Sequence, residues 1–323
     1  MILKQQEIPR LLNQYYPDIK DIKSVRELNT KSINSKNFLI ITEKEKFVLK
    51  QFLDDISSQK MEKICKIIKY CVKKNIKISE PIYNIKKKFV IQKYKMYLLK
   101  YYEGEECSCT NEQTMDLAKN LALFHKELGK ISWKYKFSRN RKRYRILNKN
   151  EISDIRKKIK RKKNLDGIDK QIMKKLDFFE ECKSQIPKKS TNFQKIKTIQ
   201  FIHGDLIPSN VIFRNNEVNT IIDIGSLRLG SVYEDLVQSS FRFSIKNTNN
   251  IISIKNKILV FLENYNYKKF EQLKFEQYQI ILLKLILEKI SFIIRERYFY
   301  KSNLWIKDLS KYFKFLDLSK NIL

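Results

Sequence analysis

Phe201-Ile-His-Gly-Asp-Leu-Ile-Pro-Ser-Asn-Val-Ile-Phe213, followed by Ile221-Ile-Asp-Ile-Gly-Ser226, is the stretch that decides the fold of this chain. Between these apolar runs, Asn215-Asn-Glu217 has the residue types of a tight turn. The pattern therefore predicts a strand, a polar loop and a β-hairpin, in that order. Polar side chains lie on the loop and at the end of the hairpin: His203, Asp205, Asn210 and Asp223.

These side chains suit phosphoryl transfer. In that chemistry one carboxylate accepts the proton of a hydroxyl group, while an Asn oxygen and a second carboxylate hold Mg²⁺ against the phosphates of a nucleotide. Mg²⁺ takes hard oxygen ligands, and a protein supplies only a few of them. The alternative is an ordinary hairpin with scattered polar turn residues. All the elements in order, on a strand, a loop and a hairpin, favour the catalytic interpretation.

At these residues the sequence resembles the aminoglycoside phosphotransferase family, a small-molecule branch of the protein-kinase-like fold that includes choline kinases and spore-coat kinase-like proteins. The family signature is His-Gly-Asp, four residues, Asn, a hairpin, and then Ile-Asp-Phe/Trp-Gly. This chain has His203-Gly-Asp205, Asn210 and Ile222-Asp-Ile-Gly225, with isoleucine in place of the aromatic residue. The resemblance implies that Asp205 is the catalytic base and that Asn210 and Asp223 are the Mg²⁺ ligands.

The same resemblance implies an α+β, bilobal, protein-kinase-like fold. Residues 1–102 would form a small N-lobe with an antiparallel sheet that binds the nucleotide. Residues 103–323 would form a larger, α-rich C-lobe with the catalytic loop and the acceptor-binding helices. A length of 323 residues with 42% hydrophobic residues suits two modest domains with substantial cores.

Lys50 is predicted to bind the phosphates of the nucleotide, and Glu62 is predicted to hold Lys50 in position. The runs at 37–42 and 46–52 predict a hairpin whose second strand places Lys50 on the same face as Val48. Kinase-like enzymes carry their phosphate-binding Lys on this third strand, and an acid in the next helix holds that Lys. Glu62, in the helix expected after Ser57, is the candidate acid. The alternatives are a surface Lys and an exposed pairing of Glu62 with Lys66.

The segment Met96–Gly104 resembles the interlobe connection of kinase-like folds, where the backbone of Lys100 to Tyr102 would bind an adenine. One expected feature is missing, because the loop Asn29–Asn37 contains no Gly to bring backbone N–H groups close to phosphate. Ser and Asn donors in that loop, such as Ser32 and Asn34, could replace it. Whether this loop supports full activity stays open at this point.

Further expectations concern the helices and the two histidines. Thr110-Asn-Glu-Gln113 predicts a capping box that opens a helix, and Gly129 is predicted to end that helix. His125 is expected to be a core residue and His203 to brace backbone carbonyl groups of the catalytic loop. Asp235 matches a later Asp of the family and is expected to brace the hairpin. Other helices are predicted at about 172–182, 250–265, 272–298 and 303–318.

The formal net charge of +32 raises the hypothesis of nucleic-acid binding. Most of this charge is Lys spread along the chain, which does not favour a nucleic-acid partner. Clustered basic residues occur only at Ser138–Arg145 and Arg156–Lys163, so the role of this basic insert, residues 139–163, is left open. A basic second lobe also argues mildly against an aminoglycoside, which is a cation, as the acceptor.

Cysteine usage and hydropathy predict a cytoplasmic protein that does not enter the membrane. The 5 Cys residues show no paired CxxC spacing, and the start of the chain is too polar for a signal peptide. The longest apolar run, Ile280–Leu287, is interrupted by Lys284 and is too short to cross a bilayer.

The sequence as a whole predicts an ATP-dependent, Mg²⁺-dependent phosphotransferase that moves the γ-phosphate to a hydroxyl group of a small molecule. One alternative is a kinase-like nucleotide-binding protein without transfer activity, and another is a basic nucleic-acid-binding protein. The identity of the acceptor, the choice between ATP and GTP, and the oligomeric state are not encoded in these motifs.

Overall fold

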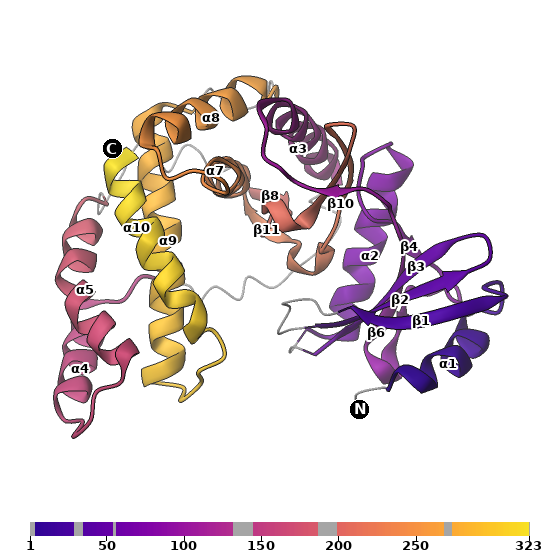
Figure 1. The fold of residues 1–323 in the computed structure, drawn as a ribbon, viewed down its shortest axis with the longest axis horizontal. Helices are drawn as coiled ribbons and strands as arrows, with labels where there is room; N and C mark the ends of the chain where they lie inside the picture. Colours follow the sequence, from indigo (N-terminus) through magenta and orange to yellow (C-terminus); the bar gives the residue numbers. More distant parts are fainter. Residues whose placement is uncertain are drawn as a thin grey trace. The chain divides into compact units, whose positions relative to one another are not determined.

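The computed structural model describes residues 4–28, 35–53, 56–131, 145–186, 199–267 and 273–322. Residue contacts divide the chain into two compact units (Figure 1). Unit 1 comprises Met1–Phe137, Gln200–Gly230 and Val260–Tyr267, and unit 2 comprises Ser138–Ile199, Ser231–Leu259 and Lys268–Leu323. The first six residues of the predicted Gly-free loop, 29–34, and the basic residues 138–144 lie outside the described residues.

Unit 1 begins with an antiparallel sheet, as predicted. Its strands follow the order β1-β2-β3-β6-β4, and β5 also pairs with β6. Alternate residues of β3 are buried, with Phe47 and Leu49 on one face and Val48 and Lys50 on the other. The strands are β1 Ile22–Leu28, β2 Ser35–Thr42, β3 Lys46–Phe52, β4 Pro81–Ile82, β5 Val90–Ile91 and β6 Met96–Lys100.

Two helices cover this sheet. The short helix η1 (Gln5–Glu7) and α1 (Ile8–Tyr15) pack Ile8 and Leu12 against Phe38 and Leu49. Each such fully buried side chain contributes about 1.5–3 kcal/mol to stability. The second helix, α2 (Ser58–Lys73), starts where Ser57 accepts a hydrogen bond from the Lys60 N–H at 3.2 Å.

Strands β4 and β5 are short, with two residues each. Asn84 is the reason. Its side-chain oxygen accepts hydrogen bonds from the N–H groups of Lys86 and Lys88, and its own N–H donates to the Lys88 carbonyl. An Asn that bonds its own neighbours in this way closes a local turn and ends the ladder.

The stretch that contains the predicted strand, polar loop and β-hairpin folds as expected. Strand β8 (Ile199–Ile202) leads into a loop with the 3-10 turn η4 (Pro208–Asn210), and β9 (Val211–Arg214) and β10 (Glu217–Ile221) then form the hairpin. Asn215 and Asn216 both have positive φ, 53° and 62°, which two-residue hairpin turns require. The 3-10 turn η5 (Ile224–Ser226) and β11 (Arg228–Ser231) follow, and β11 pairs with β8.

Helix α3 (Asn111–Ile131) corrects two sequence expectations. The predicted capping box is half formed. Thr110 accepts from the Gln113 N–H at 3.3 Å, but the Gln113 side chain accepts from Ser108 and Cys109 instead of Thr110. Gly129 does not end the helix, which continues to Ile131. A Cβ at Gly129 would lie 2.9 Å from Gln200 Oε1, so this glycine serves close packing.

Unit 2 is helical. Its core includes apolar side chains of α9, among them Leu287, Ile290 and Ile294. The predicted helices at 172–182, 250–265 and 272–298 correspond to α5, α8 and α9, whereas the last begins six residues later than expected, after a 3-10 turn. The elements are α4 Lys149–Lys160, α5 Gly167–Ser184, α7 Val232–Ser244, α8 Ile251–Asn264 (which ends in unit 1), α9 Phe275–Tyr298, η6 Ile306–Asp308 and α10 Leu309–Ile322.

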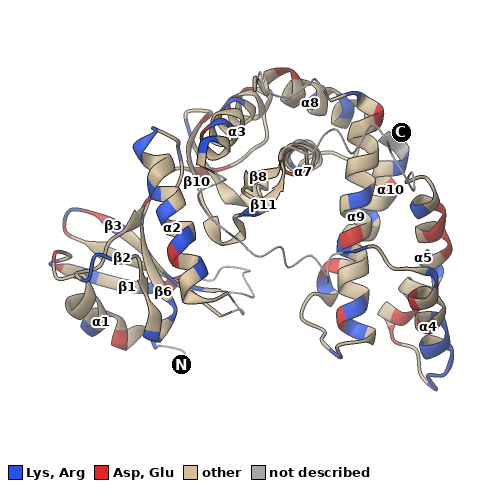
Figure 2. Ribbon diagram, turned by 180° about the vertical axis from the view of Figure 1, so that it is seen from behind, with Lys and Arg blue, Asp and Glu red and all other residues tan. Residues whose placement is uncertain are grey.

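Part of the basic run on α4 is engaged in contacts within unit 2. Arg156 bonds Asp177 and Glu180 on α5 at 2.6 and 2.8 Å. Lys158 donates to the carbonyl of Tyr298, at the end of α9, at 2.9 Å. In the ribbon of Figure 2, both acidic and basic residues occur along α4 and α5. Within the described ranges, no helix is both long and apolar enough to cross a membrane.

Candidate active site

His203 holds the catalytic loop against the end of the hairpin. Its ring is buried, Nδ1 accepts from the Asp205 N–H at 3.4 Å, and Nε2 therefore donates to the Ile222 carbonyl at 3.1 Å. Gly204 has a φ of +80°, and a Cβ there would lie 2.7 Å from the Ser226 carbonyl oxygen. Only glycine fits this close approach, and the predicted bracing role of His203 is confirmed.

Asn210 connects the loop to the hairpin and keeps one oxygen available. Its N–H donates to Ile207 at 2.8 Å, and its carbonyl accepts from the Ile222 N–H at 2.9 Å. Its side-chain Nδ2 donates to the Asp205 carbonyl at 2.8 Å, which fixes the orientation of the amide. Among the described residues, Oδ1 of this 8% exposed side chain has no protein partner. It is an acceptor suited to a cation.

Asp223 follows Ile222 directly and adopts a left-handed conformation, with φ 60° and ψ 55°. For a residue other than glycine this conformation costs about 1–2 kcal/mol, and such strain concentrates at functional sites. The carboxylate forms an ion pair with Lys50. Burial alone would raise the pKa of Asp223, but the charge and the hydrogen bond of Lys50 lower that pKa below its ordinary value.

Lys50 meets Asp223 rather than Glu62, which corrects the predicted pairing. The Lys50 side chain is only 13% exposed and bonds the Asp223 carboxylate. Glu62 accepts instead from the N–H groups of Phe89 and Val90, at 3.0 and 2.9 Å. The reason is local. The turn closed by Asn84 presents two backbone donors to the second turn of α2, and two such bonds satisfy the carboxylate.

Backbone contacts also tie the hairpin to the segment that follows α2. Ile78 forms a parallel bridge with Ile221. The Ser79 N–H donates to the Ile221 carbonyl at 2.8 Å, and the Ile221 N–H donates to the Lys77 carbonyl at 2.9 Å. Residue 221 is two positions before Asp223. The metal-ligand candidate and the strand that carries Lys50 therefore lie within one unit, and no sequence motif indicates this link.

In the connection after β6, protein hydrogen bonds already engage some of the backbone groups that were predicted to bind an adenine. The Lys100 N–H donates to the Glu80 carbonyl at 2.9 Å, and the Tyr101 N–H donates to the Lys46 carbonyl at 3.1 Å. In the described part of the chain, the backbone of Tyr102 has no such protein partner. Of the predicted segment Lys100–Tyr102, Tyr102 thus offers the backbone groups that a ligand can use.

The donor set fits Mg²⁺ better than a closed protein-bound metal site. Asn210 Oδ1 and the Asp223 carboxylate are hard oxygen ligands, and Mg²⁺ ordinarily takes one or two such ligands beside phosphate and water. Across the described residues, no cluster of three or more His, Cys, Asp or Glu side chains is arranged to hold a metal.

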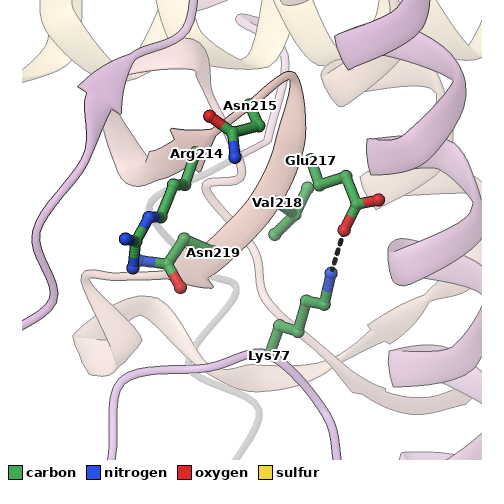
Figure 3. A pocket seen from close by; sticks show the side chains of 6 residues that line it. All are labelled: Lys77, Arg214, Asn215, Glu217, Val218 and Asn219. Carbon is green, nitrogen blue, oxygen red and sulfur yellow. Dashed lines mark ion pairs between the residues drawn. The ribbon is translucent and has the colours of Figure 1, made fainter.

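A cavity of about 290 Å³ lies on the turn end of the hairpin (Figure 3). Its ion pair joins Lys77 to Glu217 at 3.5 Å, and Asn219 donates to the Glu103 carbonyl at 2.7 Å. No residue of the catalytic loop lines this cavity, so it is separate from the Lys50–Asp223 site. The lining residues are Lys77, Arg214, Asn215, Glu217, Val218 and Asn219.

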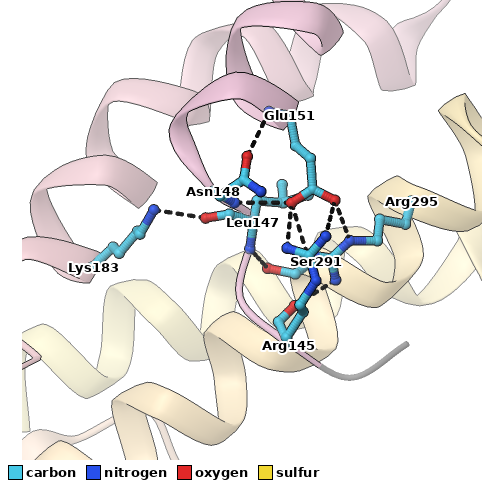
Figure 4. A network of polar contacts seen from close by, with 7 residues as sticks. All are labelled: Arg145, Leu147, Asn148, Glu151, Lys183, Ser291 and Arg295. Carbon is cyan, nitrogen blue, oxygen red and sulfur yellow. Dashed lines mark hydrogen bonds and ion pairs between the residues drawn. The ribbon is translucent and has the colours of Figure 1, made fainter. Parts of the chain in front are cut away.

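A second charged cluster lies in unit 2, at the start of α4 (Figure 4). Glu151 bonds Arg145 at 2.7 and 2.8 Å and Arg295 at 2.8 and 3.0 Å, and it caps its own helix through the Asn148 N–H at 2.9 Å. Burial opposes ionisation, but the bonds from Arg295 and Arg145 outweigh it and lower the pKa of Glu151 to about 2. Ser291 accepts from the Leu147 N–H, and Lys183 donates to the Leu147 carbonyl.

Comparison with known proteins gives one family and one fold. The family model described as "Phosphotransferase enzyme family" matches residues 24–253. No curated protein matches. A solved spectinomycin phosphotransferase, in complex with ADP and spectinomycin, is 16% identical with a TM-score of 0.72, covering 100% of this chain and 99% of its own.

Two further solved structures share the fold. An aminoglycoside phosphotransferase from Alicyclobacillus acidocaldarius is 13% identical with a TM-score of 0.64, covering 94% of this chain and 91% of its own. A choline kinase from Cryptosporidium parvum is also 13% identical, with a TM-score of 0.59, covering 99% of this chain and 96% of its own. The predicted bilobal, protein-kinase-like fold class is confirmed.

Proposed function

This chain belongs to the phosphotransferase enzyme family, and from the geometry of its site we propose that it moves the γ-phosphate of ATP to a hydroxyl group of a small molecule. One observation carries the proposal. Asp223 adopts a strained left-handed conformation and forms an ion pair with Lys50. In the catalytic loop, Asn210 keeps its side-chain oxygen available for a cation. Phosphoryl transfer needs three parts: a cation held by oxygen ligands, an ammonium group that binds the phosphates, here Lys50, and a carboxylate that accepts a proton, here Asp205.

Each residue then has a role. Asn210 Oδ1 and Asp223 hold Mg²⁺, which neutralises charge on the phosphates. When a nucleotide binds, Lys50 would leave its ion pair with Asp223, bind the phosphates and orient them. Asp205, whose backbone carbonyl is held by Asn210, accepts or orients the proton of the acceptor hydroxyl. Because the transition state is loose, positioning and charge neutralisation supply most of the acceleration.

The nucleotide base would lie at the connection after β6, where the backbone of Tyr102 would bond the adenine. We propose a functional division into residues 1–102, which bind the nucleotide, and residues 103–323, which carry the catalytic loop and bind the acceptor. This division follows roles rather than packing, since residues 200–230 pack in the same unit as residues 1–137.

The acceptor is a small hydroxylated molecule, in keeping with solved relatives that are a spectinomycin phosphotransferase and a choline kinase. The thiols of all five cysteines are outside disulfides, which supports a reducing, cytoplasmic location. Nucleic acid is not a partner in this proposal, because Arg156 and Lys158 are engaged within unit 2.

The experiment is a screen of hydroxylated metabolites and antibiotics for ATP-dependent gain of one phosphoryl group by mass spectrometry, with a parallel thermal shift by ATP with and without Mg²⁺. Transfer to one acceptor class, and a shift that needs Mg²⁺, are expected. A Mg²⁺-dependent shift without transfer or ATP hydrolysis would instead indicate a nucleotide-binding protein. The absence of both would refute the proposal.

A further inference from the structure

Two cysteine thiols meet in the loop between β7 (Glu105–Glu106) and α3. The Sγ atoms of Cys107 and Cys109 are 3.2 Å apart, and both side chains are 1% exposed. No disulfide joins them. Cys109 has a φ of +55°, which is costly for a side chain of this size. The loop is therefore held in one specific conformation that brings the two sulfurs together.

Gln113 is the residue that holds this loop. Its side-chain oxygen accepts from the N–H groups of Ser108 and Cys109 at 2.8 and 2.9 Å, and it lies 3.4 Å from Cys107 Sγ. The Cys109 N–H also lies 3.1 Å from Cys107 Sγ. The Gln113 oxygen and the Cys109 N–H thus hold the Cys107 sulfur in place beside the second thiol.

The other three cysteines have thiols with raised pKa values. Burial, the largest cause, raises the pKa of Cys71 to about 12 and that of Cys182 to about 11, and it raises the pKa of Cys65 as well. These thiols stay protonated at neutral pH. Among the described residues, none of the three contacts another sulfur. A thiol without a neighbouring thiol has no resolving partner for disulfide formation.

We propose that Cys107 and Cys109 are an oxidation site, in which a peroxide converts the two thiols into an intrachain disulfide. One thiolate attacks a peroxide oxygen, so that an S–O bond forms, the O–O bond breaks, and the released oxygen leaves as water. The second thiol attacks the resulting sulfenic sulfur, so that the S–S bond forms and the S–O bond breaks. The hydroxyl leaves with the second thiol proton as another water. Two electrons pass from the sulfurs to the peroxide.

Oxidation acts on the hairpin of the active site, because the loop is attached to it. Glu105 and Glu106 pair with Phe213 and Ile212 of β9, and the Gln113 amide donates to Asn216 at the hairpin turn, at 3.3 Å. Disulfide formation draws the sulfurs together by about 1 Å, to about 2.05 Å. This movement strains a loop whose bonds reach both strands, so amide hydrogens of β9 and β10 exchange faster in the oxidised protein.

The test treats the reduced, folded protein with hydrogen peroxide and maps its cysteines by differential alkylation and peptide mass spectrometry. We expect a loss of about 2 Da in the peptide that contains both residues, reversible by dithiothreitol. Cys65, Cys71 and Cys182 remain alkylatable after unfolding. Hydrogen exchange of residues 211–221 is compared before and after oxidation, which needs no nucleotide or acceptor.

Cys109→Ser provides the matched variant, because it removes the resolving thiol and leaves Gln113 in place. It should form a sulfenic acid at Cys107 that a dimedone probe captures, with no mass loss. An unchanged mass of the wild-type peptide, a disulfide to another cysteine, or direct sulfinic acid formation would each overturn the proposal. If mapping finds the disulfide but exchange in the hairpin is unchanged, the coupling to the hairpin is refuted.

Discussion

The Lys50–Asp223 site and the Glu151 cluster both join a carboxylate to cations, yet only one is arranged to bind a ligand. Glu151 is saturated, because two guanidinium groups and a helix N–H take up both of its oxygens. Among the described residues, Asp223 pairs with one Lys or Arg, Lys50, and it has a strained backbone and a neighbouring amide oxygen without a protein partner.

The pKa is lowered at both carboxylates, so a lowered pKa alone does not distinguish the active site from the structural cluster. The distinguishing feature is unused bonding capacity next to a strained residue. A structural cluster uses all of its donors and acceptors internally, whereas a site for phosphoryl transfer keeps some for the ligand.

The largest expected effect is on kcat, and it tests whether Asp205 serves the chemical step and not the binding of ATP. Asp205→Asn should lower kcat by about 10²–10⁴-fold, because it removes the general base while Asn keeps the size of the side chain. ATP affinity, measured by calorimetry with Mg²⁺, and the unfolding temperature should change little. Transfer at the wild-type rate in this variant would remove the base assignment.

Breaking the saturated cluster should affect stability instead. Glu151→Ala removes the carboxylate that bonds the Arg295 guanidinium, a side chain only 5% exposed, and should lower the free energy of unfolding by about 3–5 kcal/mol. Glu181→Ala is the matched control, because it removes an exposed pair with Lys320 and should cost at most about 1 kcal/mol. Urea unfolding measures both.

If Glu151→Ala stayed as stable as the wild type but lost ATP binding, the Glu151 cluster would belong to the active site and the comparison would fail. Per folded molecule, ATP affinity should stay within about twofold of the wild type, since the cluster and the catalytic loop belong to different units.

Acid should weaken the Glu151 cluster in a defined pH window. The pKa of Glu151 is lower in the folded chain than in the unfolded chain, so its contribution is complete above the ordinary value of 4.5 and is lost as pH falls to about 2. The stability difference between wild type and Glu151→Gln should therefore shrink across this window in unfolding experiments. A difference independent of pH would contradict the assigned ion pairs.

The smallest effect tests the corrected role of Glu62. Glu62→Ala leaves the N–H groups of Phe89 and Val90 unpaired and should destabilise the chain by about 1–3 kcal/mol. The KM for ATP should change less than it does in Lys50→Ala. Equal increases in KM in the two variants, with stability unchanged in Glu62→Ala, would show that Glu62 serves Lys50 after all.

Local chemistry explains what the sequence could predict. The hairpin follows from Asn215 and Asn216, which accept positive φ, and the bracing role of His203 follows from its place beside Gly204. The family signature predicted the phosphotransferase activity, and the family match confirms it.

The errors arose where distant segments compete for one group. Glu62 bonds the turn at Phe89 while Lys50 bonds Asp223, and sequence spacing does not reveal these contacts. Gly129 resembles a helix end by local rules, but the helix continues to Ile131, and a Cβ at this position would meet Gln200 from a distant part of the chain. Tertiary packing overrides local preference in both cases.

The bridge between Ile78 and Ile221 has a consequence for how this chain can evolve. Its hydrogen bonds join backbone groups only, so replacing the side chains at positions 77, 79 and 221 leaves the donors and acceptors in place. The place of the aspartate two residues beyond this bridge is therefore set by the path of the backbone and not by the identity of a polar side chain.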